Sequence, residues 1–136
     1  MISLRSQLVG RALAGMVLLA STVAPVLAAT TMSHAHSGPT RTLTGEVVDT
    51  GCFLAHGARG AKHVSCANKC IAGGMPMGLL TADGTLYLLT LDHDNADPYN
   101  QLKGMAGKTV AVTGAVVTRG GMKGIDVTGA KLVAAR

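Results

Sequence analysis

The chain has 136 residues and a formal net charge of +5 at neutral pH, from twelve Lys and Arg against seven Asp and Glu. This length suits one modest domain. The basic residues form no run, and only three residues are aromatic, whereas nucleic-acid binding needs a basic patch with stacking aromatics. These features argue against a nucleic-acid-binding protein.

The first 28 residues are typical of a secretory signal peptide. Arg5 and Arg11 precede an apolar run over residues 12–28, which ends with small residues at Val26 and Ala28. A signal peptidase recognises this spacing of small residues. We therefore expect cleavage after Ala28, a periplasmic or secreted mature protein, and no stable membrane insertion once the signal is removed.

The remaining chain divides into a short tail and one domain. Residues 29–40 are small and polar without periodicity, which predicts a flexible N-terminal tail. In residues 41–136, alternating apolar positions predict a first strand over 41–50. Two hairpins are predicted over 77–91 and 108–133, around an Asp-Gly and a Gly-Gly turn.

Two short helices are predicted between these strands. The first begins at His63 or Ser65 and runs to Ala72, where two glycines end it; the residues before it, 51–62, are interpreted as a glycine-containing loop. The second opens at Asp97 and Pro98. Since an OB-type Greek-key barrel carries a helix between its third and fourth strands, the fold predicted is mainly β: a five-stranded OB-like barrel with two short helices, one carrying cysteines.

All three cysteines lie in the segment 52–70, CFLAHGARGAKHVSCANKC. On a helix, the Cβ atoms of Cys66 and Cys70 would be about 5–6 Å apart, whereas a disulfide needs about 3.5–4.5 Å. Cys52 follows the first strand and can reach either of them, and Asp49 can anchor its segment by accepting backbone amides. Export favours a disulfide from Cys52 to Cys66 or Cys70, which would contribute about 3 kcal/mol.

Any such bridge leaves one thiol over, and this favours a second interpretation. The thiolates of Cys52, Cys66 and Cys70 and the imidazole of His63 form a complete ligand set for zinc or cuprous copper. The spacing lacks the C-x2-C knuckles of common structural zinc sites. His56 is an alternative to His63, and Met75 and Met77 are either thioether ligands or core residues.

A third interpretation is a thiol redox protein that acts through Cys66 or Cys70. Cys66 falls in the first turn of the predicted helix, a common position for reactive cysteines. However, the spacing is C-x3-C, not the C-x2-C of thioredoxin-like enzymes, and no βαβ pattern surrounds it.

Four motifs carry a resemblance to known proteins: GEVVDTGC, HVSCANKCIAGG, DGTLYLL and LKGMAGKTVAVTGAVV, which fall within residues 42–133. Together they resemble a group of uncharacterised small secreted bacterial domains with an OB-like barrel. The most specific part is D-x2-C followed by H-x2-C-x3-C-x3-G. The resemblance implies the fold and attaches no activity to it.

The sequence favours a secreted binding module over an enzyme. Its partner would be a small ligand or a periplasmic protein. The cluster of cysteines and histidine would bind zinc or copper, or would staple the ligand-facing loop; a purely structural interaction domain stabilised by one disulfide is the further alternative.

Overall fold

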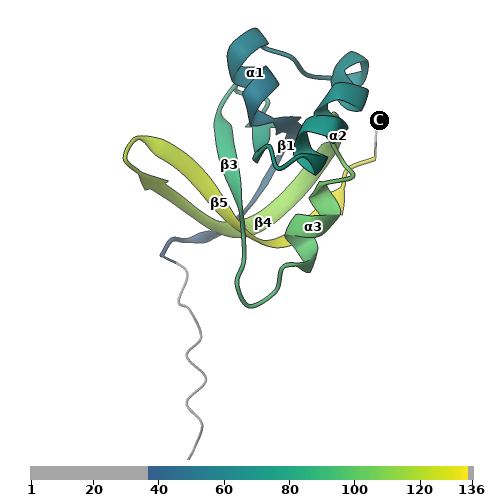
Figure 1. Cartoon of the computed structure of the whole chain (residues 1–136). Coiled ribbons are helices and arrows are strands. Elements are labelled where there is room, and N and C mark those ends of the chain that lie inside the picture. Colours follow the sequence, from purple (N-terminus) through teal and green to yellow (C-terminus); the bar gives the residue numbers. More distant parts are fainter. Residues whose placement is uncertain (1–36, 135–136) are drawn as a thin grey trace, which may run out of the picture. The chain divides into compact units, whose positions relative to one another are not determined.

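A computed structural model describes residues 37–134, which form a closed five-stranded barrel (Figure 1). Around the barrel the strand order is β1-β2-β3-β5-β4, and β1 pairs with β4 to close it. Among the strands of residues 37–134, β3 and β5 pair in parallel and the other neighbours are antiparallel. The strands are β1 (Thr40–Asp49), β2 (Met77–Thr81), β3 (Leu86–Leu91), β4 (Thr109–Arg119) and β5 (Met122–Leu132). This confirms the predicted OB-like barrel.

Glycine-containing turns join both predicted hairpins. The turn between β2 and β3 places Gly84 at φ +81°. Between β4 and β5, Gly120 and Gly121 adopt φ values of +56° and +80°. Two consecutive positive φ angles are the requirement of a type I′ hairpin turn, which explains the two adjacent glycines.

The barrel interior is filled by the alternating positions that the sequence indicates. Val47, Val110, Val112, Ile125 and Val127 are all 0% exposed and belong to one core cluster. Ala67, Ile71 and Leu102, which lie in helices, belong to the same cluster and pack against this core.

Three α-helices and one 3-10 helix accompany the barrel in residues 37–134: α1 (Thr50–His56), η1 (Ala61–His63), α2 (Val64–Ala72) and α3 (Asp97–Leu102). α3 lies between β3 and β4 in the chain, as predicted, and α2 begins within one residue of the expected position. The sequence predicts a loop at residues 51–62, but the structure has α1 and part of η1 there. Figure 1 shows α1 and α2 beside each other at one end of the barrel.

The start of the described chain lies along β4. The backbone N–H of Val116 donates to the Pro39 carbonyl at 3.1 Å, and Arg119 donates to Ser37 Oγ at 2.8 Å. The last residues of the predicted tail, 37–40, are therefore held by β4. The predicted signal peptide and tail residues 29–36 lie outside the described residues. Within residues 37–134, no helix has the length and apolar character required to cross a membrane.

Candidate metal centre

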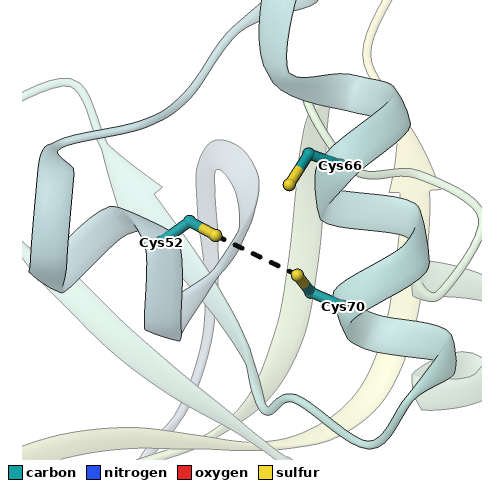
Figure 2. A group of neighbouring side chains, drawn as sticks. All are labelled: Cys52, Cys66 and Cys70. Atoms are coloured by element: carbon teal, nitrogen blue, oxygen red, sulfur yellow. Dashed lines mark hydrogen bonds between the residues drawn. The ribbon is translucent and has the colours of Figure 1, made fainter.

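The side chains of all three cysteines converge between α1 and α2 (Figure 2). Their sulfur atoms lie within 4.8 Å of one another, and those of Cys52 and Cys70 are 4.0 Å apart. Cys52 and Cys70 are half-buried, whereas Cys66 is exposed. The prediction that Cys52 can reach both later cysteines is thus confirmed.

Cys52 is positioned by the two caps of α1. Asp49, the last residue of β1, is the N-cap, and its Oδ1 accepts a hydrogen bond from the Cys52 backbone N–H at 2.8 Å. Gly57 ends the helix in the left-handed conformation at φ +67°, the usual glycine C-cap. The predicted anchoring role of Asp49 is confirmed, although it caps a helix and not a loop turn.

Cys66 and Cys70 are positioned by the buried side of α2. Ala67 and Ile71 are 3% and 5% exposed and belong to the barrel core. Each follows a cysteine by one residue, which is a rotation of about 100° around a helix. With Ala67 and Ile71 anchored in the core, the two cysteines project from the neighbouring face toward α1.

Asp49 also binds His63. A nitrogen of the His63 ring, Nε2, lies 3.0 Å from Asp49 Oδ2, and the Asp49 side chain is 0% exposed. Asp49, Cys52 and His63 form a second group whose ligand atoms lie within 4.8 Å of one another. Cys52 belongs to both groups, so the two are contiguous.

The ionisation of Asp49 identifies the protonated nitrogen of His63. Burial acts to raise the pKa of Asp49, but hydrogen bonds from Cys52 and His63 outweigh it and leave the pKa below its ordinary value of 3.8. An ionised carboxylate can only accept hydrogen bonds, so Nε2 carries the proton. In a neutral imidazole, Nδ1 then keeps a lone pair that can bind a metal.

Two of the thiols are held in the protonated form. The hydrogen bond to Asp49 and burial raise the pKa of Cys52 to about 12. Burial also raises the pKa of the Cys70 thiol; Cys66 and Asp49 add to this effect, and together they outweigh the hydrogen bond with Cys52, which acts to lower the pKa. Without a cation, Cys52 and Cys70 therefore keep their protons at neutral pH, which argues against either of them as the thiol that reacts first with an external partner.

The sulfur positions suit a single coordinated ion. Two thiolates bound to one zinc at the usual Zn–S distance of about 2.3 Å and a tetrahedral angle are about 3.8 Å apart. The Cys52–Cys70 separation of 4.0 Å is close to this value. The cluster of Cys52, Cys66 and Cys70, together with Asp49 and His63, could hold a metal ion.

The cysteines are free thiols in this structure. The 4.0 Å between the Cys52 and Cys70 sulfurs exceeds the S–S bond length of about 2.05 Å. A disulfide between Cys52 and Cys66 or Cys70 therefore stays a prediction.

The other candidate ligands differ in exposure and surroundings. His56 is exposed at the end of α1 and belongs to neither group of possible ligands within residues 37–134. Met77 is 0% exposed and part of the core, so its interpretation as a core residue is confirmed. Met75 is 37% exposed, and its thioether lies against the backbone of Gly51.

The other side of α1 borders an open groove of about 740 Å³. Leu54 is two residues after Cys52 and so projects from the opposite face of the helix. It lines the groove with Leu86 and Leu88 of β3 and with Met122 of β5. Leu54 and Met122 are 73% and 60% exposed. α1 thus separates the thiol cluster from an apolar surface.

Comparisons of this chain with protein-family models, with curated proteins and with solved structures find no match.

Proposed function

We propose that this protein is a small exported module that binds one soft metal ion, zinc or cuprous copper, through Cys52, Cys66 and Cys70. The observation that carries the proposal is the convergence of three sulfur atoms within 4.8 Å of one another. Thiolates are the preferred protein ligands of both ions. Export is inferred from the signal-peptide pattern of residues 1–28.

His63 is the fourth ligand in this proposal, through Nδ1. Metal-bound histidines usually donate their second ring N–H to a carboxylate, which fixes the ring and increases its basicity. The contact between His63 Nε2 and Asp49 Oδ2 at 3.0 Å supports this role. A ring nitrogen of His63 lies within 4.8 Å of the Cys52 sulfur, which places the ring beside the cysteine that belongs to both groups.

The raised pKa values of Cys52 and Cys70 fit a metal site better than a thiol enzyme. A bound cation reverses the local electrostatics and deprotonates coordinating thiols. Binding then releases protons, and the affinity increases with pH. An enzyme in which Cys70 was the entering nucleophile would instead need a lowered pKa at that residue.

Equilibrium dialysis of the reduced protein against zinc, and separately against cuprous copper, tests the proposal. We expect one ion per chain, lost in Cys52→Ser and Cys70→Ser and retained in Ser65→Ala, which alters an exposed neighbour of Cys66 on α2. Binding of neither ion by folded, reduced protein would reject the proposal. Binding that survives both cysteine substitutions would place the ion elsewhere.

A bound ion would also fix α1, one wall of the apolar groove. Within the described residues, α1 is tied to β1 through the Asp49 cap and to Pro76 by Thr50, whose backbone N–H and hydroxyl both donate to the Pro76 carbonyl at 3.0 Å. Coordination of Cys52 would add a link from α1 to α2. By fixing α1, the bound ion would hold one wall of the groove in place. The cluster would shape a ligand-facing surface in this way.

A further inference from the structure

The three thiols differ in accessibility. Cys66 is exposed on α2, whereas Cys52 on α1 and Cys70 on α2 are half-buried. The two half-buried sulfurs face each other across the helix pair at 4.0 Å (Figure 2). The cluster therefore combines one thiol open to solvent with a facing pair behind it.

The helices restrict which of these thiols can form a disulfide. Cys66 and Cys70 are one turn apart on α2, and Cβ atoms at this spacing are about 5–6 Å apart, beyond the 3.5–4.5 Å of a disulfide. Cys52 comes from a separate helix and faces both. Its sulfur must approach that of Cys70 by about 2 Å to reach bonding distance, which is within the range of side-chain rotation and a slight shift of α1.

We propose that the metal-free protein reacts with small-molecule disulfides by thiol–disulfide exchange, with Cys66 as the entering thiol and a Cys52–Cys70 bridge as the product. This activity goes beyond metal binding, because no ion takes part in it. A single structural disulfide would leave the third thiol without a role, whereas in this reaction Cys66 is the entering thiol.

The exchange proceeds in three displacements that balance in atoms and electrons. The Cys66 thiol loses its proton and its sulfur attacks a disulfide RSSR; the S–S bond breaks, a Cys66–SR mixed disulfide forms, and RS⁻ takes up a proton. Cys52 then loses its proton and attacks the Cys66 sulfur, which releases the second RSH and forms a Cys52–Cys66 bond. Cys70 loses its proton and attacks the Cys52 sulfur, which releases Cys66 as a thiol. Overall, two protein thiols are oxidised and one RSSR is reduced to two RSH.

Accessibility and helix spacing assign the order of these steps. An external disulfide reaches an exposed sulfur before a half-buried one, which makes Cys66 the entry point. Cys70 cannot resolve the mixed disulfide, because it lies on the same helix as Cys66 at an unsuitable spacing. Cys52 therefore resolves it, and the final bridge lies at the half-buried pair, where reductants have less access.

Peptide mapping by mass spectrometry tests this inference on protein that has been stripped of metal with a chelator, fully reduced and then exposed to oxidised glutathione. We expect a Cys52–Cys70 crosslink, with Cys66 free to be alkylated. Cys66→Ser should form the same crosslink at least about tenfold more slowly. Cys70→Ser should stop at a Cys52–Cys66 crosslink, and Cys52→Ser should accumulate glutathione on Cys66. Ser65→Ala is the control and should behave as the wild type.

A final Cys52–Cys66 or Cys66–Cys70 crosslink in the wild type would overturn the inference, as would a Cys66→Ser rate equal to that of the wild type. The wild-type map decides the identity of the bridge even if a variant folds poorly. Zinc binding by the reduced protein is measured separately. A chain that binds no metal but forms this crosslink would reject the proposed function and keep this inference.

Discussion

The sulfur atoms of Cys52 and Cys70 lie 4.0 Å apart although 18 residues separate them in the chain. Two short helices create this contact: the caps of α1 position the first, and the core residues Ala67 and Ile71 of α2 position the second. The contacts of both helices thus bring the two thiols together.

Each cysteine substitution should weaken zinc binding strongly. Loss of an outer-shell partner typically lowers metal affinity by about 10- to 100-fold, so removal of a thiolate ligand should cost at least about 100-fold. Competition with a chromophoric chelator measures this for Cys52→Ser, Cys66→Ser and Cys70→Ser. A cysteine whose substitution leaves the affinity unchanged is not a ligand.

Substitutions of His63 and His56 should differ in their effect on zinc affinity. His63→Asn removes the proposed fourth ligand and should reduce zinc affinity by at least about tenfold. His56→Asn is a matched control, because His56 lies outside both groups of possible ligands, and it should bind zinc like the wild type. Equal effects of the two substitutions would contradict the assignment of His63.

The reactivity of Cys52 should depend on Asp49. The Asp49 carboxylate is the leading cause of the raised pKa of Cys52, about 12 against an ordinary value of 9.0. Asp49→Asn removes this charge, so a larger fraction of Cys52 is thiolate at neutral pH. We expect faster alkylation of Cys52 by iodoacetamide in metal-free Asp49→Asn than in the wild type, measured by peptide mass spectrometry. Slower alkylation in the variant would contradict the pairing of these two groups.

Asp49 should also make the stability of the fold depend on pH. Its pKa in the folded state is lower than the ordinary value of 3.8. A carboxyl group of this kind stabilises the folded state at pH values above its unfolded pKa, and that stability is lost as the pH falls through the folded pKa. Asn caps helices about as well as Asp, so Asp49→Asn should reduce the free energy of unfolding at neutral pH mainly because an uncharged acceptor makes weaker hydrogen bonds to Cys52 and His63, by about 1 kcal/mol.

This difference between the wild type and Asp49→Asn should shrink as the pH falls below about 4, the ordinary pKa range of aspartate. Urea titrations at a series of pH values measure it. A difference that stays constant down to acidic pH would show that the carboxylate charge of Asp49 has no part in stability.

Much of the fold could be predicted from the sequence, because its signals are local. The Asp-Gly and Gly-Gly turns and the alternating apolar residues specify the strands, and Pro98 marks the start of α3. α1 was not predicted, although its caps, Asp49 and Gly57, are both visible in the sequence. Their spacing leaves only two helical turns, and Gly51 and Gly57 resemble loop glycines.

The sequence placed the three cysteines together correctly but did not pair His63 with Asp49. This hydrogen bond joins residues 14 positions apart, and it forms because α1 and η1 fold back over the end of β1. The sequence left open whether His63 begins the helix or precedes it; in the structure His63 is the N-cap of α2 and groups with Asp49 and Cys52. Only the three-dimensional path of the chain between β1 and β2 reveals this.

Zinc should reduce the motion of α1. Coordination of Cys52 links α1 to α2, so the backbone amides of α1 should gain protection from hydrogen exchange when zinc is bound. The amides of α3 are an internal control, because this short helix carries no cysteine. Hydrogen exchange with mass spectrometry, with and without zinc, measures both. Equal protection of α1 in the two states would contradict a link through Cys52.

X-ray absorption spectroscopy of the zinc-loaded, reduced protein tests the central claim most directly, because it counts and identifies the atoms bound to the ion. The predicted shell contains three sulfurs at about 2.3 Å and one imidazole nitrogen at about 2.0 Å. A shell of oxygen and nitrogen atoms without sulfur would contradict the claim that Cys52, Cys66 and Cys70 hold the metal.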